Sequence, residues 1–187
     1  MRHVISALVI NEPGVLSNVA NMFSARGFNI DSLVVGRTED PQYSRMTIVV
    51  LADDNTLDQV RKQLAKLVPV VQVQDFAGSS FVERDLALIT VGAGPAQRAE
   101  VSNLTALFGG KVVDVAPETM MVELTGGEEE MDRFIDLLRP YGIRELARTG
   151  VIAQPRGVQP ATSTVSTGPA KRTRRLDAPA QMALPPS

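Results

Sequence analysis

Cysteine and tryptophan are absent from the 187-residue sequence, and histidine occurs once, as His3. Without cysteine the chain can form no disulfide framework and no thiolate metal site, and one histidine leaves no imidazole pair for zinc or iron. A Ser-His-Asp triad would have to use His3, which we expect to be structural because it lies in an apolar predicted strand. The chain therefore has few side chains suited to acid–base catalysis, and we expect a non-catalytic protein without a metal site.

Long hydrophobic runs are also absent. No apolar stretch reaches the roughly 18 to 20 residues that are needed to cross a bilayer. An apolar segment starts almost directly after Met1, which leaves no room for a secretory signal, so the expected location is cytoplasmic. Hydrophobic residues make up 44% of the chain, which argues for a packed protein of one medium domain or two small ones.

The most informative feature that is present is the segment of residues 11–16, Asn-Glu-Pro-Gly-Val-Leu. It lies between an apolar run, residues 4–10, and a segment with apolar residues at helical spacing. A strand that turns through Pro-Gly into a helix leaves unpaired backbone N–H groups, here near Gly14, Val15 and Leu16. Such a group of donors suits a carboxylate.

Two asparagine side chains extend this candidate site. The amides of Asn11 and Asn29 can each donate and accept hydrogen bonds, as binding of a zwitterionic amino acid requires. The apolar Ile30, next to Asn29, is the sixth residue of the predicted effector site, after Asn11, Gly14, Val15, Leu16 and Asn29. At Gly14, any Cβ atom would crowd a ligand that lies against the backbone. The alternative is purely structural, with Asn11 capping the helix and Gly14 turning the chain.

Hydrophobic periodicity predicts the same order of elements twice. The first set is a strand, a helix, two strands, a helix and a strand, at residues 3–10, 15–26, 29–37, 44–52, 55–67 and 70–76. The second set follows about eighty residues later, at residues 86–91, 96–108, 111–115, 120–124, 131–138 and 143–152. This βαββαβ order is ferredoxin-like and places both helices on one face of a four-stranded antiparallel sheet. The predicted fold class is therefore α+β, with two ferredoxin-like domains.

Small residues at positions 77–80 suit a turn between the domains. We therefore predict a first domain at residues 1–77, a linker at 78–84 and a second domain at 85–157. Beyond this point the sequence is rich in Pro, Ala, Ser and Thr and has no periodicity, so residues 158–187 are predicted to be a disordered tail.

Charge is unevenly distributed along the chain. The segment from Pro155 onward carries +4 and the remainder −6, which together make the net charge of −2. A solvated run is the favoured interpretation of the basic cluster at residues 171–175, and an acidic folded part argues against nucleic-acid binding. RNA-recognition modules share the βαββαβ order but stack bases on aromatic residues, which are only 4% of this chain.

Residues 92–97, Gly-Ala-Gly-Pro-Ala-Gln, imitate a dinucleotide-binding fingerprint. They follow a predicted strand and open a helix, and Asp114 lies twenty residues past Gly94. The sixth position is Gln97, where the fingerprint needs Gly or Ala for close helix packing, and a second βαβ half is absent. We therefore do not expect NAD binding.

Strands of the first domain carry apolar residues on both faces, because Met46, Ile48 and Val50 alternate with Thr47, Val49 and Leu51. Two helices cover only one face of such a sheet, and exposed apolar area costs about 25 cal/mol per Å². We expect self-association or docking onto a larger partner to cover the other face. The alternative is that the second domain covers this face of the sheet.

The strand, Asn-x-Pro-Gly-Val-Leu, helix, Gly-Phe-Asn-Ile pattern resembles the amino-acid-sensing ACT domain. Further motifs are similar to the small, regulatory subunit of acetohydroxyacid synthase (acetolactate synthase), and this resemblance covers about residues 1–157. These motifs are Ser-Arg-Met-Thr-Ile at residues 44–48, Lys-Gln-Leu-Ala-Lys-Leu-Val at 62–68, Val-Glu-Arg-Asp-Leu at 82–86 and Ala-Arg-Thr-Gly-Val at 147–151.

The resemblance implies a regulatory subunit that activates a catalytic large subunit and confers feedback inhibition by valine in branched-chain amino acid biosynthesis. It implies a homodimer in which Asn11 and Gly14 of one subunit bind valine together with Asn29 of its neighbour. The cofactors thiamine diphosphate, Mg²⁺ and FAD would belong to the catalytic subunit, with none in this chain. The alternative is an ACT-type sensor that controls a different enzyme or a transcription regulator. The choice among valine, leucine and isoleucine stays open.

Overall fold

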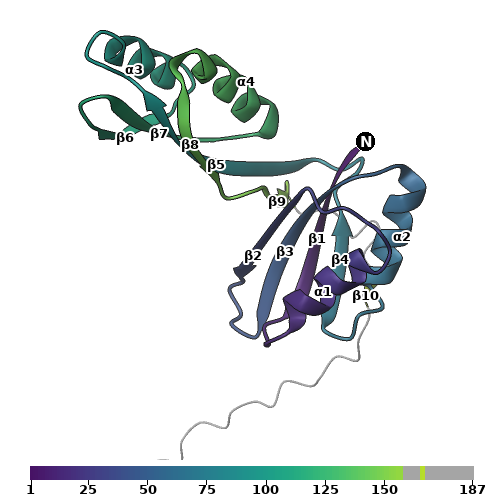
Figure 1. The fold of residues 1–187 in the computed structure, drawn as a ribbon. Helices are drawn as coiled ribbons and strands as arrows, with labels where there is room; N and C mark the ends of the chain where they lie inside the picture. The colour runs from purple at the N-terminus through teal and green to yellow at the C-terminus, as the bar shows by residue number, and fades with distance from the viewer. Residues whose placement is uncertain (158–164, 167–187) are drawn as a thin grey trace, which may run out of the picture.

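The computed structural model describes residues 1–157 and 165–166 (Figure 1). The elements of the first domain are β1 (Arg2–Ile10), α1 (Val15–Ser24), β2 (Ser32–Arg37), β3 (Tyr43–Leu51), α2 (Asp54–Leu64) and β4 (Val70–Asp75). The antiparallel sheet has the order β10-β4-β1-β3-β2, in which β10 (Val165–Ser166) pairs with β4. The predicted βαββαβ domain is confirmed, and the predicted tail otherwise lies outside the described residues.

The core of the first domain lies between the sheet and the two helices on one of its faces (Figure 1). Strand alternation turns Ile5 of β1 and Ile48 of β3 into this core, where they are opposite each other in the register. Both helices end two or three residues before the predicted ends, where the structure has turns rather than further helix. Strand β2 begins three residues later than predicted, at Ser32, because ladder pairing with β3 starts only there.

The second domain repeats the arrangement. It contains β5 (Phe81–Gly92), α3 (Arg98–Leu107), β6 (Lys111–Val115), β7 (Thr119–Gly126), α4 (Glu128–Leu138), a 3₁₀ turn (Arg139–Tyr141), β8 (Ile143–Arg148) and β9 (Ile152–Pro155). Its main sheet has the order β6-β7-β5-β8, with β5 paired to both β7 and β8. Within the described residues, no helix is long and apolar enough to cross a membrane.

Strand β5 extends from beside the first domain into the second domain, as Figure 1 shows. Its first four residues pair with β9, and the rest form the centre of the second sheet. The strand begins at Phe81, so the last four residues of the segment predicted as a linker, 78–84, are a strand. The division into domains at 1–77 and 85–157 stays a prediction, because the two-stranded ribbon of β5 and β9 belongs to neither repeat.

This ribbon covers part of the first sheet on the face opposite its helices. Val4 and Val49 of the sheet form a buried apolar cluster with Val151 and Ala153 of the returning chain. Phe81 packs against this cluster, with its ring centroid 4.9 Å from that of Phe76. The alternative that the second half of the chain covers the apolar outer face is therefore correct for this part of the sheet.

Charged side chains join the first domain to the second. Arg2 of β1 donates to Glu83 of β5 at 3.0 Å and forms a second ion pair with Glu128 at the start of α4. Burial raises the pKa of the Glu128 carboxyl although the charge of Arg2 opposes this shift. Within the second domain, the buried carboxylate of Asp85 is paired with Arg148 at 2.6 Å. Burial lowers the pKa of Arg148, but Asp85 and Asp132 together raise it above its usual value.

The predicted last strand, residues 143–152, is two strands in the structure. The chain turns at Gly150, whose φ of 84° favours glycine, and the backbone there lies against β2 of the first domain. A Cβ atom at Gly150 would be 2.5 Å from the Oγ of Ser32, and the N–H of Val151 donates to the same Oγ at 3.4 Å. Periodicity alone does not reveal this break, because it comes from a contact between domains.

Candidate functional site

Four of the six predicted site residues lie in the loop from β1 to α1 and in the first turn of that helix. Gly14 has φ of 85° and ψ of −11°, a left-handed conformation, and precedes a helix that has no side-chain cap. The N–H of Val15 makes only a long hydrogen bond, 3.4 Å, to the carbonyl of Glu12. For the N–H of Leu16 we find no acceptor within the described residues. The first turn of α1 therefore presents backbone donors that the chain itself does not use.

Asn11 does not cap α1. Its side-chain Nδ2 donates to the carbonyl of Pro41 at 3.1 Å, and its N–H donates to the carbonyl of Gln42 at 2.8 Å. The alternative that Asn11 serves to cap the helix is thus wrong, because Asn11 instead hydrogen-bonds to the loop between β2 and β3. The side chain is exposed, and its Oδ1 accepts no hydrogen bond from the described residues.

Space at this loop is open. No atom lies within 4 Å of the position that a Cβ of Gly14 would occupy. Leu16 is 46% exposed, whereas the side chain of Val15 is buried in the core. Val15 can therefore contribute its N–H but not its side chain, and the exposed apolar surface beside the donors comes from Leu16.

Asn29 and Ile30 lie at the opposite end of α1. The helix has ten residues, so about 15 Å of helix separates them from the Gly14 turn. Asn29 is exposed, and Ile30 is half-buried against the core of the first domain. The structure does not bring these two residues to the first turn within one chain, so a site that uses both ends of α1 requires two copies of the chain.

A second hollow lies on the outer face of the first sheet, and none of the six predicted residues lines it. It has a volume of about 450 Å³ and lies between the strands β2 and β3 and the ribbon of β5 and β9. Sequence reasoning missed it because its residues come from four separate segments. The one hint in the sequence was that the motifs at residues 44–48 and 82–86 contain Arg45 and Arg84, which line this hollow. Within the described residues, no group of three or more His, Cys, Asp or Glu side chains is placed to hold a metal ion.

Comparison with known proteins assigns both halves of the chain. Residues 5–72 match the family described as the AHAS small subunit-like ACT domain, and residues 84–157 match the family described as the small subunit of acetolactate synthase. A probable acetolactate synthase small subunit from Archaeoglobus fulgidus is 52% identical over 157 residues, which are 84% of this chain and 98% of that protein. The chain belongs to the family of acetolactate synthase small subunits.

Other members of this small-subunit family agree. The acetolactate synthase small subunit of Bacillus subtilis is 40% identical over 89% of this chain and 98% of its own length. The crystal structure of the small subunit from Thermotoga maritima is 42% identical and superposes with a TM-score of 0.78, covering 85% of this chain and 99% of that one. The ACT-type domains and the ferredoxin-like fold class expected from the sequence are confirmed.

Proposed function

We propose that this chain is the non-catalytic regulatory subunit of acetolactate synthase, which activates the catalytic large subunit and confers feedback inhibition by valine in branched-chain amino acid biosynthesis. The observation that carries the proposal is the first turn of α1. Its uncapped N–H groups, the left-handed Gly14 and the open space above it form a receptor for a carboxylate.

The binding mode that we propose uses the donors at the start of α1 for the valine carboxylate. The exposed Leu16 offers apolar surface to the isopropyl group, and the Oδ1 of Asn11 is available to the ammonium group. Asn29 of the partner subunit completes the site, since Asn29 lies at the far end of α1 in its own chain. A homodimer is therefore part of the proposal, and β2 is the edge strand through which two sheets could pair.

Inhibition in this scheme is a coupling between two sites. Thiamine diphosphate, Mg²⁺ and FAD would be bound by the catalytic subunit and would supply the chemistry there. Valine must then prefer one arrangement of the assembly, and couplings of this kind amount to about 1 to 3 kcal/mol. A cytoplasmic location, expected from the sequence, belongs to the same proposal.

The test combines a binding and an activity measurement. Titration calorimetry of the purified chain against valine, leucine and isoleucine should show saturable binding of valine. The chain should also increase acetolactate formation by the catalytic subunit, and valine should reverse that increase. A chain that binds valine but leaves the catalytic subunit unchanged would indicate a sensor for another target, and a chain that does neither would refute the proposal.

A further inference from the structure

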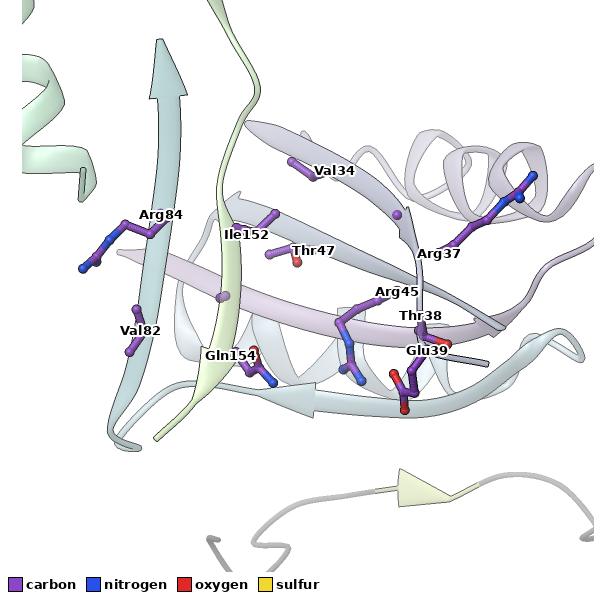
Figure 2. Close-up of a pocket in the computed structure, with 12 residues that line it drawn as sticks. Val34, Arg37, Thr38, Glu39, Arg45, Thr47, Val82, Arg84, Ile152 and Gln154 are labelled. Carbon is purple, nitrogen blue, oxygen red and sulfur yellow. The ribbon is translucent and has the colours of Figure 1, made fainter. Parts of the chain in front are cut away.

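The hollow on the outer face of the first sheet is rich in arginine (Figure 2). Arg37 comes from the end of β2, Arg45 from β3 and Arg84 from β5. Among the described residues that line it, Glu39 is the one carboxylate, although the chain as a whole carries a net charge of −2. We call this hollow with its rim the arginine groove.

None of the three arginines has a carboxylate partner within the described part of the chain. Arg45 donates to the hydroxyl of Ser6 at 3.0 Å, and Arg84 donates to the carbonyl of Glu83 at 2.7 Å. Elsewhere on the molecule ion pairs are common, and the paired arginines are Arg2, Arg61, Arg133, Arg139 and Arg148. The guanidinium groups of the groove therefore remain able to bind external carboxylates in the bidentate manner that arginine favours.

The floor of the arginine groove is apolar and ends at a free strand edge. Val34 and Ala153 line it together with Ile152, which is 56% exposed. Strand β9 pairs only with β5 among the described strands, and Figure 2 shows β9 lying between β5 and the strands of the first sheet. The unpaired edge of β9 offers main-chain donors and acceptors to an extended segment.

The arginines are too widely spread for one small anion. In Figure 2, Arg84 and Arg37 point away from the hollow on opposite sides of it, and Arg45 lies between them. A segment that crosses the hollow can contact Arg45 and, at the rim, Arg84, with its apolar side chains on the floor. A small anion could reach only one of these two arginines.

We infer that the arginine groove is the docking site for an acidic, partly apolar segment of the catalytic subunit. This inference rests on the proposed function, because it names the surface through which that function would act. The occupant follows from charge complementarity with Arg45 and Arg84, which have no carboxylate partner in the described chain, and from apolar surface that the ribbon leaves exposed. The site is separate from the start of α1, so docking and effector binding can be changed independently.

The test reverses two charges in the groove and compares the result with a single charge reversal elsewhere. The variant Arg45→Glu/Arg84→Glu should bind the catalytic subunit at least about tenfold more weakly by surface plasmon resonance, and wild-type binding should weaken as salt rises. Arg144→Glu is the matched control, because Arg144 is exposed, has no ion pair in the described chain and lies on β8. It should bind within about twofold of the wild type.

Folding of the double variant is checked by circular dichroism and by its affinity for valine, which should equal that of the wild type. Unchanged affinity of the double variant for a catalytic subunit that the wild type activates would overturn the inference and leave the proposed function intact. A change of oligomeric state in sedimentation, without the catalytic subunit, would show that the occupant is a second copy and would also overturn it. Saturable binding of citrate that the double variant loses, with subunit affinity unchanged, would assign the groove to small anions instead. A wild-type chain that neither binds nor activates the catalytic subunit would refute both proposals.

Discussion

The two domains repeat one order of elements but differ in the loop that leads into the first helix. In the first domain nothing lies within 4 Å of a Cβ built on Gly14, and no side chain caps α1. In the second domain a Cβ on Gly92, the last residue of β5 before the loop, would be 2.8 Å from the carbonyl oxygen of Tyr141. Arg98, the first residue of α3 after the loop, donates to the carbonyls of Ala116 and Pro117 at 2.9 and 2.8 Å. One loop is open, and the other is filled by the chain itself.

This difference shows that the order of elements does not by itself create a ligand site. Both loops contain glycine and proline and both open a helix, so both offer backbone donors in principle. Neighbouring groups close the second loop, because the 3₁₀ turn and the segment before β7 pack against it. The close contact at Gly92 supports the prediction that the Gly-Ala-Gly segment binds no dinucleotide, because that fingerprint needs the ligand to approach the glycine backbone closely.

The largest expected effect comes from breaking the joint that holds the two domains. Gly150→Ala places a methyl group 2.5 Å from the Oγ of Ser32 on a residue with positive φ. Strain and overpacking together should lower the free energy of unfolding by about 3 kcal/mol in urea denaturation. Gly157→Ala is the control, because its φ is also positive but nothing lies within 4 Å, and it should cost about 1 kcal/mol. Equal losses would mean that the contact between domains has no energetic role.

Removing the side chain that closes the second loop should have the next largest effect. Arg98→Ala deletes two hydrogen bonds from a charged donor and should lower the free energy of unfolding by about 2 kcal/mol. Valine stoichiometry in calorimetry should not increase, because the carbonyl of Tyr141 still blocks Gly92. Arg144→Ala is the control, because Arg144 is an exposed residue on β8, the edge strand of the second sheet. It should change the free energy of unfolding by less than about 0.5 kcal/mol. A second valine site in Arg98→Ala would show that the side chain of Arg98 alone prevents the second loop from binding valine.

Filling the open loop tests the effector site. Gly14→Asp places a carboxylate where the valine carboxylate is proposed to bind, and valine affinity should fall at least about tenfold, or 1.4 kcal/mol, by calorimetry. Gly109→Asp is matched to it, because both glycines have positive φ and free space around the Cβ position, and its valine affinity should be unchanged. Activation of the catalytic subunit should survive in both variants. Wild-type valine affinity in folded Gly14→Asp would refute the site.

The smallest effect concerns the second helix of each domain. Asp53 caps α2 by accepting from the N–H of Thr56 at 2.7 Å, whereas α4 starts at Gly127 without a side-chain cap. This hydrogen bond lowers the pKa of Asp53 below 3.8, so the carboxylate stabilises the fold above that pH and loses its effect as pH falls through the lower folded value.

Asp53→Ala should therefore be less stable than the wild type at neutral pH, and the difference should shrink in strong acid. Urea unfolding at both pH values measures this change. Gly127→Ala removes no cap and should show no comparable pH dependence. A stability difference for Asp53→Ala that is independent of pH would mean that the charge of Asp53 does not contribute.

Much of the fold could be predicted because local patterns carry it. Apolar residues at helical spacing predict that Val15, Leu16, Val19, Met22 and Phe23 form the buried face of α1. The structure buries all of them except Leu16, which is 46% exposed. The Pro-Gly turn correctly predicted where α1 begins. The break in the last strand at Gly150 was missed, because a glycine at a domain contact looks in the sequence like any turn residue.

The repeat, the two cores and the position of the loop before α1 could be predicted, since they depend on residue spacing and turn chemistry within about a dozen residues. Three features could be seen only in the folded chain: β5 joins both domains, α1 separates Asn29 from Gly14, and Arg45 and Arg84 line one groove. These outcomes depend on contacts between segments far apart in the chain. A local hydrophobic pattern contains no information about which distant surfaces meet, because packing selects them by shape and charge after the elements have formed.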